Sequence, residues 1–340
     1  MKLIDLQNIN FPNKNDERYR GVNLKALLNQ EFKQTKAYQV DIKSLDEKLD
    51  SVKYDDFLFD VTKVVTTKQS VLEIKENTNK PIVIYHRLCS DDTLFANSLE
   101  IIVKKGVIAS IIEVFESDGY NSADTINRNI ICAQDAKLEY VKIQDIRADN
   151  TLIFNCEFTQ YANSRVDVYN FDYGDGLVLN TFNNTFNHKK AIYNLYGLVK
   201  LNHKANCSNL IHTLHQEEDC VSNIDFKHSL DDKSKAVFKA NSRVENEAKN
   251  SKAFQNANTI LLSDDATILA EPHLQIFVDE LEASHGTTTG SLDEEQLLYL
   301  QMRGISKQKA TMILLDAFEK EIYNSIQDQN IKNFIDEFKG

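Results

Sequence analysis

Short apolar segments follow one another through the middle of the chain, from Pro81 onward. The links between them are short and rich in Asn, Asp, Ser and Lys. Leu99, Ile101 and Val103 are every second residue and so lie on one face of their segment. This spacing is typical of a half-buried strand. The predicted strands cover residues 82–85, 99–103, 107–115, 126–132, 138–143, 152–158, 166–171, 177–182, 192–201, 210–214, 221–226, 236–238 and 259–262.

These segments have no amphipathic helix between them, which disfavours a βαβ sheet. A sandwich, a barrel or a stacked β-solenoid remain. Asn-rich turns such as 180–187 suit a solenoid, in which like side chains stack on successive coils. The sequence has no clean repeat period, however, so the pattern alone leaves all three architectures open.

The first 80 residues have a more mixed and polar pattern. Residues 22–28 and 42–49 have the spacing of short amphipathic helices, and residues 54–65 are strand-like. These elements predict a small N-terminal domain that packs on the next one.

A strand and a corner are predicted near the other end of the chain. Leu274, Ile276 and Val278 alternate with other residues, as in a half-buried strand. Glycine and a run of threonine then follow in residues 284–290. This composition is unfavourable for a helix or a long strand, so it predicts a corner.

Two helices follow this corner. A side-chain oxygen of Asp293 can accept a hydrogen bond from a free backbone N–H, so the first helix begins there. Gly304 ends it, because glycine adopts the left-handed conformation without steric cost, and Ser306 starts the second helix. The second helix has two apolar sets, the first comprising Ala310, Ile313, Leu314, Ala317, Phe318 and Ile322 and the second Met312, Leu315 and Tyr323.

This stretch closely resembles the C-terminal signature of the SufB/SufD family, whose members form the scaffold that builds iron–sulfur clusters with the ATPase SufC. The matching residues are, in order, Pro272, Leu274, Ile276, Asp279, Glu280, Leu281, Ser284, His285, Gly286, Thr288, Gly290, Leu292, Asp293, Glu294, Glu295, Leu297, Tyr299, Leu300, Arg303, Gly304, Ile305, Ser306 and Ala310. SufB-type chains have Glu-His-Glu-Ala at the corner and SufD-type chains have Ser-His-Gly. Ser284-His285-Gly286 is therefore similar to the SufD type.

The resemblance implies a mainly β fold with a right-handed parallel β-helix core. The expected domains are an N-terminal α/β or helical domain over 1–80, the β-helix over 81–288 and a helical domain over 289–340. The chain would not be an enzyme. It would pair with a SufB-like chain through the core, and its C-terminal helices would dock a SufC-like ATPase. ATP-driven closing of two SufC subunits would then strain the core pair and open its interface.

His285 is the first candidate for chemistry. It lies among small residues, and imidazole suits iron and other borderline metals. From the residues alone, a histidine that only bonds to backbone is the competing interpretation. The resemblance implies an interface ligand that meets SufB and helps to admit iron. Many SufD chains have cysteine where this chain has Ala283, so any thiolate would come from the partner.

A cluster normally needs several thiolates, which one imidazole cannot replace. We therefore expect no cofactor held stably by this chain alone, only transient iron or an iron–sulfur cluster at the SufB interface.

The C-terminal helices are the second candidate. The resemblance implies SufC docking there, and we expect Tyr299, Met312, Leu315 and Phe318 to take part. Arg303 and Gly304 are expected to fix the turn between the helices rather than to touch the partner. A wide contact with the chain's own core is the alternative explanation for two apolar faces.

A third set, His212, His215, Cys220 and His228, has a spacing that approaches a zinc site. On a strand His212 and His215 would point to opposite faces, so we favour structural or surface roles. The five cysteines are scattered and contain no CxxC pair, which argues against a disulfide framework. Cys89, Cys132 and Cys156 lie in or beside apolar segments and are expected to be buried and inert.

The net charge and the hydropathy of the chain exclude some classes of binding partner. The formal net charge of −12 argues against non-specific nucleic-acid binding, which needs clustered Lys and Arg. No apolar run reaches membrane-spanning length, and the first residues have no signal or transit pattern, so a cytoplasmic protein is expected.

Two other functions stay open: a SufB-like homodimeric scaffold, and a β-solenoid enzyme acting on carbohydrates through acidic turns such as Asp231-Asp232 and Asp264-Asp265.

Overall fold

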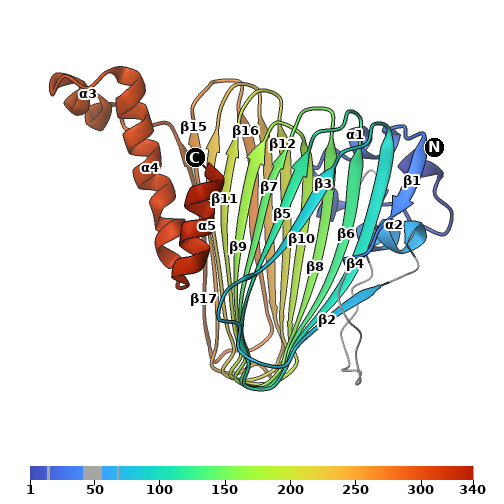
Figure 1. The fold of residues 1–340 in the computed structure, drawn as a ribbon. Coiled ribbons are helices and arrows are strands. Elements are labelled where there is room, and N and C mark those ends of the chain that lie inside the picture. The colour runs from blue at the N-terminus through green and yellow to red at the C-terminus, as the bar shows by residue number, and fades with distance from the viewer. Residues whose placement is uncertain (14–15, 41–55, 67–68, 340) are drawn as a thin grey trace.

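The computed structural model describes residues 1–13, 16–40, 56–66 and 69–339. Most of these residues form two parallel sheets packed face to face (Figure 1). The strands are β1 (Gln34–Ala37), β2 (Ser70–Ile74), β3 (Ile82–Leu88), β4 (Thr93–Val103), β5 (Ile108–Ser117), β6 (Ala123–Cys132), β7 (Lys137–Ile146), β8 (Thr151–Gln160), β9 (Arg165–Gly174), β10 (Leu177–Phe186), β11 (Ile192–Leu201), β12 (Asn206–His215), β13 (Val221–Leu230), β14 (Lys235–Val244), β15 (Ser251–Leu261), β16 (Thr267–Ile276) and β17 (Leu281–Gly290). The helices are η1 (Leu3–Asp5), η2 (Glu17–Tyr19), α1 (Leu24–Asn29), α2 (Phe57–Val65), α3 (Glu294–Met302), α4 (Lys307–Ser325) and α5 (Gln329–Lys339).

Successive strands alternate between the two sheets. From β4 to β16 the even-numbered strands follow one another in one sheet, and from β3 to β17 the odd-numbered strands follow one another in the other. All of these pairs are parallel, so each coil of the chain contributes one strand to each sheet. This is a parallel β-solenoid, and it confirms the predicted mainly β fold with a β-helix core. Every strand segment predicted from residue 81 onward lies within or overlaps an observed strand, although most observed strands are longer.

One residue with positive φ occurs in almost every turn of the solenoid. Asn and Asp predominate, because their short polar side chains tolerate the left-handed region better than other non-glycine residues. The turns contain Asp92, Asn121, Asp135, Asp149, Asn163, Lys190, His203, Asp219, Asp232 and Asn250. These single left-handed residues reverse the chain between the sheets without a long loop.

The space between the sheets is filled mainly by apolar side chains, such as Ile126, Phe154 and Phe182, that are completely buried. Burial of each such side chain contributes roughly 1.5–3 kcal/mol to stability. Phe154 packs on Phe182 in the next coil with ring centroids 5.8 Å apart. Aromatic contacts between successive coils are therefore part of the core, whereas residues 180–186, expected in an Asn-rich turn, belong to the strand β10.

Two charged clusters are buried in this interior. In the first, Arg128 Nε donates to Glu113 Oε1 at 2.8 Å, and His86 Nε2 lies 3.1 Å from Glu113 Oε2. In the second, Lys142 Nζ donates to Asp172 Oδ1 at 2.6 Å. All of these side chains are almost completely excluded from solvent. Each charge therefore depends on its partner rather than on water.

The N-terminal segment packs on the outer face of the even-numbered sheet. Leu27, Phe57 and Leu58 join Leu179 and Leu210 of that face in one apolar cluster. β1 and β2 both pair with β4 and extend this sheet.

Helix α1 confirms the helix predicted at 22–28, and the helix predicted at 42–49 lies outside the described residues. The strand predicted at 54–65 was wrong. Asp56 caps a helix there by accepting from Leu58 N at 3.0 Å, and the apolar side chains of α2 pack into the cluster on the sheet. The domain boundaries at 80 and 288 stay predictions.

The corner predicted at 284–290 was also wrong, because these residues belong to the strand β17. It pairs in register with β15 from Ser251–Leu281 to Ile260–Gly290. The pairing holds the Gly and Thr residues extended, and threonine suits a strand because of its branched Cβ.

The caps predicted for the two helices are confirmed: Asp293 accepts from Glu295 N and Gln296 N, Ser306 accepts from Lys309 N, and Gly304 has φ +84°.

Candidate functional site

The last coil of the solenoid has uncovered edges. The sheets end at β16 and β17, and neither strand has a neighbour on its outer side among the described residues. From Ser284 to Gly290 every residue of β17 is exposed. The backbone groups of such edges are free to pair with another chain.

His285 lies in the middle of this exposed edge strand. Leu281 and Ala283 pack partly against the last coils, and alternation puts His285 on the same face as they are. Ser284 and Gly286 fall on the opposite face. A Cβ on Gly286 would meet only Asn256 Oδ1 at 3.9 Å, so this glycine is not required for packing within the chain.

The nearest partner in register is Gln255 on β15. Gln255 is 2% exposed, and its Nε2 donates to Ser242 Oγ at 2.7 Å and to the His273 carbonyl at 3.1 Å. Its Oε1 is buried and has no hydrogen-bond partner in the described part of the chain. The edge at His285 thus combines an exposed imidazole with an unsatisfied amide oxygen beneath it.

His285 lies outside any group of metal-ligating side chains in the described part of the chain. Among the described residues, no group of three or more His, Cys, Asp or Glu side chains is arranged for a metal ion. Burial raises the pKa of the Cys132 thiol to about 12 and of the Cys220 thiol to about 11. Both thiols therefore stay protonated, whereas the thiolate is the form that binds metal. Cys89 is exposed at the end of β3, so the prediction that it is buried was wrong.

The helices α3 and α4 form a second exposed surface. Figure 1 shows α3 lying clear of both sheets at the end of α4. Tyr299 is 57% exposed and Met312 is 58% exposed, as docking would require. Arg303 packs on Tyr299, with its guanidinium 5.2 Å from the ring centroid. Leu298, Met302 and Ile313 are exposed as well. Sequence reasoning missed these three, although apolar residues on both faces of the helices were a usable signal.

The other two predicted docking residues face their own chain. Leu315 is buried, and Phe318 is half-buried beneath Lys227, whose Nζ lies 4.8 Å from the ring centroid. The two apolar sets of α4 were therefore assigned wrongly, since Ile313 is exposed. The orientation of α4 is set nearer its C-terminal end, where Ile322 and the helix α5 pack on the outer face of the odd-numbered sheet.

The predicted His/Cys set is not brought together. His215 is buried against Phe186, with Nε2 2.9 Å from Ser222 Oγ, and burial lowers its pKa to about 3. His228 is buried beside Phe226, and burial lowers its pKa to about 4. His212 lies on the opposite face of β12, in a cavity of the outer surface. The favoured structural interpretation agrees with this geometry.

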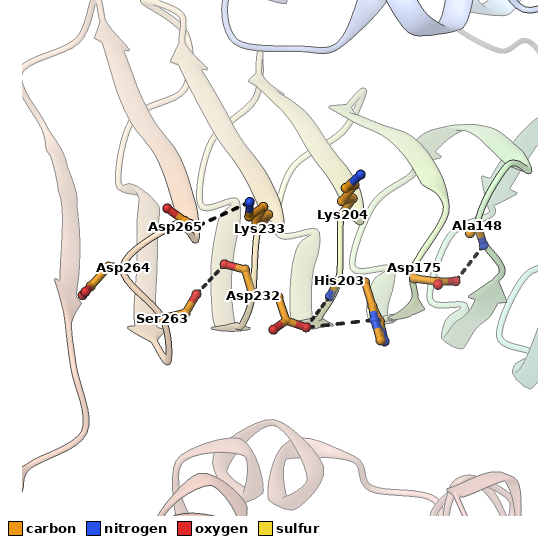
Figure 2. Close-up of a pocket in the computed structure, with 9 residues that line it drawn as sticks. All are labelled: Ala148, Asp175, His203, Lys204, Asp232, Lys233, Ser263, Asp264 and Asp265. Carbon is orange, nitrogen blue, oxygen red and sulfur yellow. Dashed lines mark hydrogen bonds and ion pairs between the residues drawn. The ribbon is translucent and has the colours of Figure 1, made fainter.

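The acidic turns line an open groove of about 720 Å³ (Figure 2). Asp175 Oδ1 accepts from Ala148 N at 2.6 Å, and Asp232 Oδ2 accepts from His203 N at 3.0 Å. Each bond joins one coil to the next. These two carboxylates therefore stabilise the turns.

Three further observations place the chain among known proteins. Residues 86–318 match the family model described as "SUF system FeS cluster assembly, SufBD core domain". The iron-sulfur cluster assembly protein SufD of Plasmodium falciparum (isolate 3D7) is 35% identical over 139 residues, which are 41% of this chain and 10% of that protein. The SufD protein of Escherichia coli (strain K12) is 32% identical over 118 residues, 35% of this chain and 28% of that protein. The matched stretches thus span less than a third of either relative.

No helix among the described residues is long and apolar enough to cross a membrane.

Proposed function

Because this chain belongs to the SufB/SufD family of iron–sulfur cluster assembly proteins and is of the SufD type, we propose that it is a non-catalytic scaffold subunit in cluster assembly. It pairs with a SufB-like chain through the end of the solenoid and docks a SufC-like ATPase on α3 and α4. Both named relatives are assembly proteins, which supports the general role. The cytoplasmic location stays a prediction.

The observation that carries the proposal is the uncovered last coil. β16 and β17 offer two parallel edges, and a second solenoid could continue both ladders or cover the exposed end. The inner side chains of β14 are buried, whereas Ile276 of β16 is 43% exposed. A partner that covers this end would remove that apolar surface from water.

Iron or a nascent cluster is the cargo of this interface. His285 would supply an imidazole from this chain, and the partner would supply thiolates. The imidazole must be neutral to bind metal. Gln255 beneath it could accept a hydrogen bond through Oε1 and orient the donor side of an imidazole or a partner group.

The proposal is tested by co-expressing the chain with SufB-like and SufC-like proteins from the same source and measuring the mass of the purified complex. One SufB, two SufC and one copy of this chain are expected. A homodimer that carries two SufC would instead support the SufB-like alternative. A monomer that binds neither the SufB-like nor the SufC-like protein would rule out the scaffold role.

We expect His285→Ala to leave this complex assembled and to lower the yield of clusters by about tenfold or more, since loss of groups around a metal typically costs 10–100-fold. The readout is cluster absorbance and bound iron after reconstitution. Thr287→Ala, on the same face two residues along β17, is the matched control. Equal cluster yields in the two variants would refute the role of His285.

We expect Met302→Asp to weaken SufC binding by about 30-fold, because a charge in the centre of an apolar contact removes a hot spot of about 2 kcal/mol. Met302 is 78% exposed, so the fold should tolerate the change. Gln308→Asp adds the same charge at a nearby exposed polar position and should have little effect. Binding is measured by surface plasmon resonance. Unaltered affinity in Met302→Asp would place the docking surface elsewhere.

The carbohydrate-enzyme alternative has no observation in its favour. One of its candidate acids, Asp232, accepts a backbone hydrogen bond from the neighbouring coil.

A further inference from the structure

The turns that lead from the even-numbered strands to the odd-numbered strands form one ridge, at the lower end of the sheets in Figure 1. Backbone hydrogen bonds join each turn to the next. Asn163 N donates to the Lys189 carbonyl at 3.2 Å, and Lys190 N donates to the Glu218 carbonyl at 3.1 Å. Neighbouring turns therefore follow one another at about the 4.8 Å spacing of hydrogen-bonded strands, and the ridge is a regular, rigid support for its side chains.

The charges on this ridge are separated by sign. Turns 104–107, 133–137 and 187–190 contain five lysines and a single acid, Asp135, whereas turns 216–219 and 245–247 contain acids and no lysine or arginine. Within the described part of the chain, the exposed lysines without an ion-pair partner are Lys105, Lys137, Lys189 and Lys190, and the carboxylates in the same situation are Glu217, Glu218, Asp219 and Glu247.

The change of sign falls between two neighbouring turns. Lys190 and Glu218 belong to these two turns, yet no ion pair joins their side chains among the described residues. Elsewhere on the ridge a cation is neutralised within the chain, as where Arg165 Nε lies 2.7 Å from Asp167 Oδ2. The charges on either side of the boundary are therefore free to meet those of a second molecule.

We propose that two copies of this chain associate along this ridge, side by side and in opposite directions. A two-fold axis between the turns of Lys190 and Glu218 places the lysines of each copy against the carboxylates of the other, so that the same contact occurs twice. A parallel arrangement would place like charges together, which is unfavourable. The rings of Tyr161 and His188, stacked with centroids 5.0 Å apart, lie beside the axis and add aromatic surface to the contact.

A second copy fits this surface better than a polyanion does. A nucleic acid or an anionic lipid surface would meet only the lysines and would be repelled by Glu217 and Glu218, and the formal net charge of −12 opposes it as well. The turn that leads into β17, residues 277–280, is not part of the proposed surface. The association therefore goes beyond the scaffold function and does not rest on it.

The contact is narrow, so we expect it to bury less than the roughly 1,200 Å² of a standard interface and to be weak. Sedimentation velocity of the full chain at two salt concentrations tests it. We expect a monomer–dimer equilibrium in about 0.02 M NaCl, with a dissociation constant at least about tenfold larger in about 0.5 M NaCl, because the Debye length falls from about 20 Å to about 4 Å. Pairing through the backbone edge of β17 would respond much less to salt.

Two double variants make the test specific to the ridge. Lys189→Glu with Lys190→Glu makes both sides of the axis negative, and Glu217→Lys with Glu218→Lys makes both sides positive. Each double variant should associate with itself at least about tenfold more weakly than the unaltered chain, because every reversed pair becomes repulsive and the symmetry repeats it. An equimolar mixture of the two should recover the dimer, since each contact again joins opposite charges.

Lys204→Glu with Lys233→Glu is the matched control, because it reverses two exposed lysines in the turns at the opposite ends of the strands. This control should associate like the unaltered chain. A monomer at both salt concentrations, association that persists in either ridge variant alone, or a mixture that associates no better than its components would overturn the proposal. None of these results depends on SufB or SufC.

Discussion

Replacement of Arg128 by methionine is expected to lower the free energy of unfolding by about 3–5 kcal/mol, the cost of leaving one member of a buried ion pair alone. Arg128 makes hydrogen bonds to both carboxylate oxygens of Glu113, and Nη1 donates to Asn97 Oδ1 at 2.8 Å. Burial alone would raise the pKa of Glu113, but Arg128 and His86 lower it to about 2. Without the guanidinium, the carboxylate must stay charged without its main partner or take up a proton.

Urea unfolding followed by circular dichroism measures this loss. Arg165→Met is the control, since the Arg165–Asp167 pair at 2.7 Å is partly exposed and is expected to contribute less than about 1 kcal/mol. Combining Arg128→Met with Glu113→Gln should recover much of the stability, because the lone charge is then removed. A loss of only about 1 kcal/mol in Arg128→Met alone would show that water reaches this cluster.

Acidification is expected to destabilise the protein through its buried histidines. The pKa of His215 is about 3 in the folded chain and 6.5 when unperturbed. Between these values the unfolded chain binds a proton that the folded chain does not. Stability is therefore complete above pH 6.5 and falls as the pH decreases, by about 1.4 kcal/mol per pH unit for one such group.

His215→Gln keeps a neutral polar side chain at every pH and removes this proton. The stability lost between pH 7 and pH 4.5 should shrink by about 3 kcal/mol relative to the unaltered chain. His188→Gln, which changes an exposed histidine, is the control. The measurement is urea unfolding at a series of pH values. Parallel curves for the unaltered chain and His215→Gln would mean that His215 is protonated in the folded state.

Alternation along the chain was sufficient to find the core strands, because one face of a strand meets the apolar interior between the sheets and every second residue is therefore apolar. Leu99, Ile101 and Val103 are all completely buried, as predicted. The solenoid itself was hidden by its changing coil length. Thr151 pairs with Leu177, but Lys235 pairs with Thr267, so no single period repeats in the sequence.

Local composition gave the wrong secondary structure at two places where tertiary contacts determine it. Residues 284–290 have the glycine content of a turn, yet pairing with β15 holds them extended. Residues 57–65 are rich in branched and aromatic side chains, yet the cap at Asp56 and packing on the sheet make a helix.

The same difference between local sequence and tertiary contacts decides which candidate sites could be predicted. His285 was found because its neighbours in sequence form a recognisable motif. The cavity on the outer surface that holds His212 could not be found from the sequence, since Thr181, His212 and Asn241 come from three different coils and meet only through stacking. The burial of Leu315 rather than Ile313 likewise depends on how α5 holds the end of α4 against the sheet.

In mechanical terms, α4 is a lever. Its 19 residues form a rod of about 28 Å at 1.5 Å per residue. One end carries the exposed surface of α3, and the other is held on β11 and β13, where Glu319 lies 3.3 Å from Lys200 and Glu321 lies 2.6 Å from Lys227. β13 is hydrogen-bonded to β15, and β15 to β17. A force applied at the helices would therefore act as a torque on the sheet whose last strand holds His285.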